Sequence, residues 1–196
     1  VDDCVQWDHP DLAANMWINE AELNGQSGKD DDGNGYKDDI YGYNFVTNTN
    51  LTISTAGELG SRTHGTHVAG TVAAVNNNGT GVCGIAGGSG NNDGVKLMSC
   101  QIFYNESGGT STTTSRAITY AADNGASILQ CSWGYTAGTI TSDSQYSSYD
   151  SAERQAIDYF ISTKNCDALD GGLAIFAAGN DMIGMSGYPA AYRDYI

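Results

Sequence analysis

The chain has 196 residues, 40% of them apolar and 10% aromatic, and its 23 acidic and 8 basic side chains give a formal net charge of −15. A chain of this length buries one sizeable core, which predicts a single domain. The charge excludes nucleic acid and anionic membrane surfaces as partners, since both repel an acidic protein. No apolar run is long enough for membrane insertion, and the 26 glycines with many Asn, Ser and Thr residues favour an extracytoplasmic location.

Apolar runs alternate with helical patterns along the chain. In chain order, the sequence predicts a helix over 66–75, a buried strand over 95–103, a helix over 114–124, and buried strands over 126–132 and 173–178. Strands that alternate with helices predict an α/β fold with a mostly parallel central sheet flanked by helices. Such sheets place functional groups beyond the carboxyl ends of their strands.

The stretch KDDDGNGYKDD, residues 29–39, resembles the first half of an EF-hand loop that begins at Asp30. Counted from Asp30, oxygen-bearing side chains stand at alternate positions and Gly35 is the sixth residue. The glutamate expected in twelfth place is absent, because Tyr41 stands there. The candidate calcium ligands are Asp30, Asp32 and Asn34, with Asp38 or Asp39 as the missing carboxylate. A solvated acidic turn explains the same residues equally well.

The stretch HGTHVAGTVAAV, residues 64–75, places a histidine in the first turn of a helix. Gly65 is small enough for another backbone to approach, and the helical spacing predicts an apolar stripe of Val68, Val72 and Val75. A neutral imidazole at the positive end of a helix suits a general base. A histidine that only packs beside the helix is equally compatible, and His67, one turn on, allows a metal ion shared with His64.

Four segments in order resemble the subtilisin-like serine proteases. VDDCVQWDHPDL at 1–12 resembles the aspartate motif of that family, and HGTHVAGTVAAV resembles its histidine motif. ASILQCSWGY at 126–135 resembles the strand that forms one wall of the substrate cleft, and LAIFAAGND at 173–181 resembles the oxyanion strand. The resemblance implies one peptidase domain over 1–196, of the three-layer subtilisin-like fold and incomplete at both ends.

The resemblance also assigns catalytic roles. It implies that His64 is the base of an Asp-His-Ser triad and that Asp2 orients it, with Asp3 as a bystander. Asn180 would donate its side-chain N–H to the oxyanion of the tetrahedral intermediate. Cys4 stands where the family has a glycine.

A polypeptide substrate is implied as well, paired with the cleft as an added strand. The residues expected to contact it are Gly108, Gly109, Ser132, Trp133, Gly134, Ala178 and Gly179.

Calcium is the implied cofactor. Related subtilisin-like sequences carry a similar acidic insertion, which here covers about residues 28–41. The resemblance implies a second site built from Asp11, Asn77 and the carbonyls of residues 75–82. A polar loop that leaves the helix is the alternative interpretation of this second site.

The family's serine lies in a GTSMA motif downstream of the oxyanion asparagine, and the chain contains no such motif. Ser186 precedes the stretch Tyr188-Pro189-Ala190, which in the family comes before the serine segment, so we reject Ser186 as the nucleophile. We expect the serine to lie outside these residues and the chain alone to be inactive. We also expect exposed apolar surface on the sheet, which would cause self-association or bind the missing C-terminal segment.

Three functions remain open from the sequence. The leading prediction is a serine endopeptidase domain that uses Asp2 and His64. The second is a peptide- or calcium-binding module that kept the cleft and lost the nucleophile. The third is a metal hydrolase in which His64 and His67 share an ion.

Overall fold

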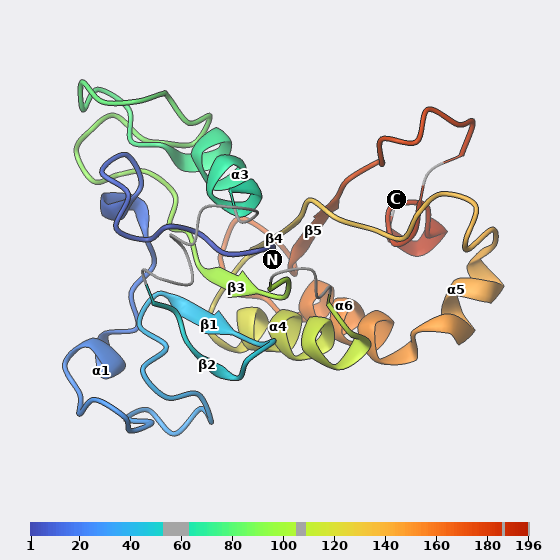
Figure 1. The fold of residues 1–196 in the computed structure, drawn as a ribbon, viewed down its shortest axis with the longest axis horizontal. Helices are drawn as coiled ribbons and strands as arrows, with labels where there is room; N and C mark the ends of the chain where they lie inside the picture. The colour runs from blue at the N-terminus through green and yellow to red at the C-terminus, as the bar shows by residue number, and fades with distance from the viewer. Residues whose placement is uncertain (53–62, 105–108, 186, 196) are drawn as a thin grey trace. The chain divides into compact units, whose positions relative to one another are not determined.

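The computed structural model describes residues 1–52, 63–104, 109–185 and 187–195. The chain divides into two compact units, one formed by Asp2–Gly108 and the other by Val1 with Gly109–Ile196. Figure 1 labels the elements of both units, and each unit is described by itself. Two positions considered above, Gly108 and Ser186, lie outside the described residues.

The Asp2–Gly108 unit contains a three-stranded sheet in the order β2-β1-β3. Strand β1 (Gly42–Asn44) pairs parallel with β3 (Ser99–Gln101) and antiparallel with β2 (Thr49–Asn50). A Cβ at Gly42 would collide with the Ser99 carbonyl, so this close pairing requires glycine. Strand β3 is buried throughout and lies inside the predicted strand over 95–103.

Among the described residues of the same unit are three helical elements. They are the 3-10 turn η1 (Ala13–Asn15) and the α-helices α1 (Glu20–Leu23) and α3 (His64–Ala73). Helix α3 begins at His64, two residues before the predicted start. Its buried side consists of small residues, Gly65, Ala69 and Ala73, whereas Val68 and Val72 of the predicted stripe are only half-buried. The missing side-chain bulk lets neighbouring backbone pack directly onto this helix.

The second unit contains two parallel strands, β4 (Ile128–Cys131) and β5 (Leu173–Phe176), both inside the predicted runs. The N-terminal ammonium of Val1 donates to the carbonyl of Gln130 in β4 at 3.0 Å. Ile128, Leu173 and Ile175 are exposed, so one side of this pair presents apolar side chains.

The second unit also contains four helical elements among its described residues. They are the helices α4 (Ser111–Asp123), α5 (Asp143–Tyr149) and α6 (Ser151–Ser162) and the 3-10 turn η2 (Arg193–Tyr195). Helix α4 packs against α6, which also contacts β5 (Figure 1). Parallel strands combined with helices make the fold α/β, as the sequence predicted. Across the described residues, none of the helices has the length and apolar character needed to cross a membrane.

Candidate active site

Asp2 lies at the carboxyl end of β3, where a parallel sheet gathers functional groups. Its backbone N–H donates to Cys100 O at 3.1 Å, and its carbonyl accepts from the Ile102 N–H at 2.9 Å. The carboxylate reaches the His64 ring, 62 positions along the chain, with Nδ1 at 2.8 Å from Oδ1 and 3.0 Å from Oδ2. The structure therefore brings together the two side chains that the motifs pair.

The contact with Asp2 changes the electrostatics of the imidazole. Its hydrogen bond raises the pKa of His64 above the usual 6.5, partly opposed by burial and reinforced by the charges of Asp2 and Asp3. The side chain of His64 is 58% exposed, whereas that of Asp2 is 12% exposed. When Nδ1–H donates to the carboxylate, the lone pair of Nε2 is the one available to accept a proton.

Asp3 holds the backbone of the same histidine. Its Oδ1 accepts from the Gly65 N–H at 2.6 Å and its Oδ2 from the His64 N–H at 3.3 Å. These N–H groups begin α3 and have no partner inside the helix, so Asp3 caps the helix from a neighbouring segment. Burial raises the pKa of Asp3 more than the hydrogen bond from Gly65 lowers it, and the Asp2 charge raises it further. Asp3 therefore caps the helix that carries His64.

The start of α3 and the segment after Asp2 touch closely. A Cβ at Gly65 would collide with Cys4 O and lie 2.7 Å from the Asp3 carboxylate, so only glycine fits there. A second contact joins the same two segments, because Thr66 Oγ1 accepts from the Gln6 N–H at 2.9 Å. Cys4 has a φ of 129°, in the region that favours glycine, so it keeps a glycine-like backbone at a strain of about 1–3 kcal/mol.

The remaining predicted catalytic and substrate residues belong to the second unit, apart from Gly108. Residues Ser132–Gly134 follow β4 and Ala178–Asn180 follow β5, both at the carboxyl edge of this parallel pair. Asn180 is exposed, and Gly179 before it has a φ of 94°. The Trp133 indole donates to Val1 O at 3.1 Å and packs edge to face on Phe176, which gives this side chain a structural role. Gly109, exposed, precedes α4.

A cleft of about 410 Å³ lies just beyond β5. The Ala137 N–H donates to Asp181 Oδ2 at 3.2 Å and links two of its walls. Its lining residues are Ala137, Ala178, Gly179, Asp181, Met182, Ile183, Gly184 and Met185. Ala178 and Gly179 were predicted from the sequence and the other lining residues were not, although those after Asn180 directly follow the oxyanion motif.

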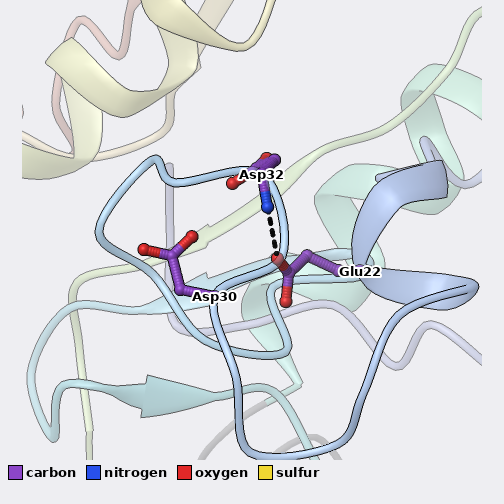
Figure 2. Close-up of side chains that lie close together, drawn as sticks. All are labelled: Glu22, Asp30 and Asp32. Carbon is purple, nitrogen blue, oxygen red and sulfur yellow. Dashed lines mark hydrogen bonds between the residues drawn. The ribbon is translucent and has the colours of Figure 1, made fainter.

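The acidic stretch folds around a carboxylate that the sequence analysis missed. Glu22, buried in α1, accepts from the backbone N–H groups of Asp31 and Asp38, at 2.5 and 2.8 Å, and from that of Asp32 at 3.3 Å. One oxygen each from Glu22, Asp30 and Asp32 lie within 4.8 Å of one another (Figure 2). Three converging carboxylates form an all-oxygen donor set that fits a hard cation such as Ca²⁺.

Backbone hydrogen bonds shape this cluster further. Burial acts to raise the pKa of Asp30, but hydrogen bonds from the backbone N–H groups of Gly35, Gly33 and Asn34 outweigh it and lower that pKa below the usual value. Asp30 is therefore held in its charged form, the form that binds a cation.

The other predicted ligands of this loop have partners within the protein. Asn34 donates its amide to both Asp32 and Asp39, each at 3.0 Å. Asp39 is fully buried and also accepts from Asn19 at 3.1 Å. Asp38 accepts the Gly28 N–H. These three side chains hold the shape of the loop.

The predicted second calcium loop wraps around Asp11, which is almost fully buried. Its Oδ1 accepts from the Asn78 amide at 2.7 Å and its Oδ2 from the Val82 N–H at 2.8 Å. Asn77 directs its amide nitrogen away, to Ser89 O at 2.9 Å. The side chain that contacts Asp11 is thus Asn78.

Comparison with known proteins places this geometry in a family. A model of the Subtilase family matches residues 1–196, so the chain belongs to the subtilases. The chain is 33% identical over 167 residues to Subtilisin-like protease 1 of Plasmodium berghei, covering 85% of this chain and 25% of that protein. It is 30% identical over 196 residues to Thermitase of Thermoactinomyces vulgaris, covering all of this chain and 51% of Thermitase.

A solved structure shares the fold. The S41 psychrophilic protease superposes with a TM-score of 0.56 at 22% identity, covering 97% of this chain and 48% of that one. This supports a subtilisin-like α/β fold. The chain spans about half the length of Thermitase and a quarter of the Plasmodium protein.

Proposed function

We propose that the chain supplies the base, its orienting carboxylate and the oxyanion donor of a serine endopeptidase. The Asp2–His64 contact carries this proposal, because a carboxylate on Nδ1 leaves Nε2 to take a proton. Family membership supports the reaction class. We infer that the nucleophilic serine lies outside these 196 residues.

In this mechanism Nε2 of His64 removes the serine proton as the hydroxyl attacks the peptide carbonyl, and then returns it to the leaving amine. Asp2 holds the tautomer and stabilises the imidazolium. Asn180 donates to the oxygen that gains charge, a contribution of about 10²–10³ in rate. Asp3 and Gly65 keep the base in place.

The substrate in this proposal is a polypeptide bound in extended form. The residues proposed to flank it are Gly108, Gly109, Ser132, Gly134, Ala178 and Gly179, and the cleft beyond β5 receives one of its side chains. An extracytoplasmic location is supported by the acidic, Gly- and Asn-rich composition.

We also propose that Glu22, Asp30 and Asp32 bind calcium. The ion would neutralise three carboxylates and stabilise the loop without a part in the chemistry. The loop around Asp11 is a second candidate, in which the Asn77 carbonyl oxygen and backbone carbonyls would complete the site.

An inactive peptide- or calcium-binding module is the competing function, in which the proposed cleft and the acidic loop would bind without a nucleophile. A metal ion shared by His64 and His67 is the third candidate function, because a carboxylate on Nδ1 leaves Nε2 of His64 open to a metal ion as well as to a proton.

The test is digestion of unfolded casein by the full-length protein that contains residues 1–196, with products identified by mass spectrometry. We expect internal cleavages with a kcat of roughly 1–10³ s⁻¹. Calcium-dependent binding of casein with no cleavage would support the binding module instead.

A further inference from the structure

A cluster of polar side chains lies under the loop that follows Ser132–Gly134. Tyr135 comes from that loop, Tyr146 from α5, and Asp150 and Glu153 from the start of α6. Glu153 is 2% exposed, Asp150 is 7% exposed and Tyr146 is fully buried. The roles proposed above use none of these four groups.

The hydrogen bonds link them into one chain. Tyr146 Oη donates to Glu153 Oε1 at 3.0 Å. Tyr135 Oη lies 3.3 Å from Glu153 Oε2 and 3.3 Å from Asp150 Oδ2. The other oxygen of Asp150 accepts from Ser111 Oγ of α4 at 2.5 Å and from the Glu153 N–H at 2.9 Å.

If both Glu153 and Asp150 are ionised, this hydrogen-bond network has one donor too few. The Tyr135 hydroxyl has a single proton and faces two carboxylate oxygens, so it can satisfy only one of them well. A proton on Glu153 Oε2 removes the conflict. Glu153 then donates to Tyr135 Oη, and Tyr135 donates to Asp150, so that every oxygen has a partner and the cluster carries one negative charge.

The surroundings favour this protonated form. The titratable groups that face Glu153 are Tyr146, Asp150 and Tyr135, while Tyr195 faces Tyr146. Burial and the charge of Asp150 raise the pKa of Glu153 to about 7, although the phenol hydrogen bonds oppose the shift. Burial together with the nearby acids raises the pKa values of both tyrosines, so their hydroxyls stay protonated.

Tyr135 connects the cluster to the cleft. Its backbone N–H donates to Tyr188 O at 2.8 Å, and two residues later Ala137 lines the cleft and donates to Asp181. Tyr135 also directly follows Ser132–Gly134, which are proposed to flank the substrate. Residues 132–137 are called the substrate wall below. A change in the bonding of this phenol therefore acts on both substrate-facing segments.

We propose that Glu153 and Asp150 share one proton through Tyr135, and that this pair is a pH-sensitive positioning device for the substrate wall between Ser132 and Ala137. The inference rests on the proposed peptidase function. Once Glu153 loses its proton, two buried carboxylates face the single proton of the Tyr135 hydroxyl. Tyr135 then keeps one good hydrogen bond in place of two, and the position of residues 132–137 is less restrained. Substrate binding then weakens as pH rises through about 7.

Infrared difference spectra of the full-length protein between about pH 6 and about pH 8 test the shared proton without any substrate. We expect the carbonyl stretch of a protonated carboxyl group to disappear on raising the pH. Glu153→Gln removes this band, and Glu20→Gln, at an exposed glutamate of α1, leaves it in place. A wild-type spectrum without the band at about pH 6 overturns the inference, even if the protein is an active peptidase.

The KM for one internally quenched peptide that the protein cleaves tests the positioning role. We expect KM to rise about five- to tenfold between about pH 6 and about pH 8, the equivalent of one lost hydrogen bond. Glu153→Gln places an uncharged side chain at this position at every pH, as in the protonated form of Glu153. The KM of this variant is therefore expected not to change with pH, while the pH dependence of kcat, set by His64, is unchanged. A flat wild-type KM, or equal KM profiles for both proteins, contradicts the proposal. A protein that cleaves no peptide refutes the peptidase and leaves the infrared result standing.

Discussion

Replacing His64 with alanine in the full-length protein is expected to lower kcat about 10⁴- to 10⁶-fold, with KM nearly unchanged. The imidazole acts only as the proton is transferred, so its loss removes transition-state stabilisation and leaves substrate binding intact. Steady-state kinetics on a single peptide measure both constants.

His67→Ala is the matched control. His67 lies one turn further along α3 and is exposed, and its backbone N–H donates to Thr63 O. We expect kcat to change less than about twofold. Equal losses in the two variants, restored by added metal, would instead indicate an ion shared by both histidines. An active His64→Ala variant would remove this residue from the mechanism.

Removing calcium is expected to lower the Tm of the protein by about 5–10 °C. Without a cation, the carboxylates of Glu22, Asp30 and Asp32 repel one another within 4.8 Å. An ion at about 100 times its Kd stabilises the folded state by about 2.7 kcal/mol, and each kcal/mol moves the Tm of a domain this size by about 2–4 °C. Thermal unfolding with and without a chelator measures the shift.

Two variants assign that shift to the acidic loop. Asp30→Asn removes one charged ligand and should shrink the calcium-dependent change in Tm, whereas Asp167→Asn, at an exposed site outside the loop, should preserve it. An undiminished shift in Asp30→Asn would contradict this site and point to the loop around Asp11. No shift in any of the proteins would mean that both loops are simply solvated.

The sequence predicts strands β3, β4 and β5, helices α3 and α4, and the pairing of Asp2 with His64, because these depend on periodicity and on ordered motifs. It does not predict that Asp3 caps α3, since the capping residue comes from a segment distant in sequence. Val68 and Val72 illustrate a related limit. Their spacing indicates a buried stripe, yet the chain packs on the small face of α3, where Gly65 permits direct backbone contact.

Buried acids are the other feature that local patterns conceal. Glu22 lies well before the acidic motif in a short helix, and only the fold of the loop brings it to Asp30 and Asp32. Glu153 lies in α6, and it is 2% exposed. Its burial depends on tyrosines from two other segments, Tyr135 and Tyr146, which a linear pattern cannot bring together.

The most direct test of the central claim is labelling with a serine-directed fluorophosphonate, followed by peptide mapping. In the full-length protein we expect one adduct, on a serine beyond residue 196, and its formation should be slowed strongly by Asp2→Asn, because the wrong imidazole tautomer no longer activates the hydroxyl. The 196-residue chain alone should remain unlabelled. Two results would contradict the account. One is an adduct on any serine within residues 1–196, Ser186 above all, and the other is labelling of the Asp2→Asn variant at the same rate as the unsubstituted protein.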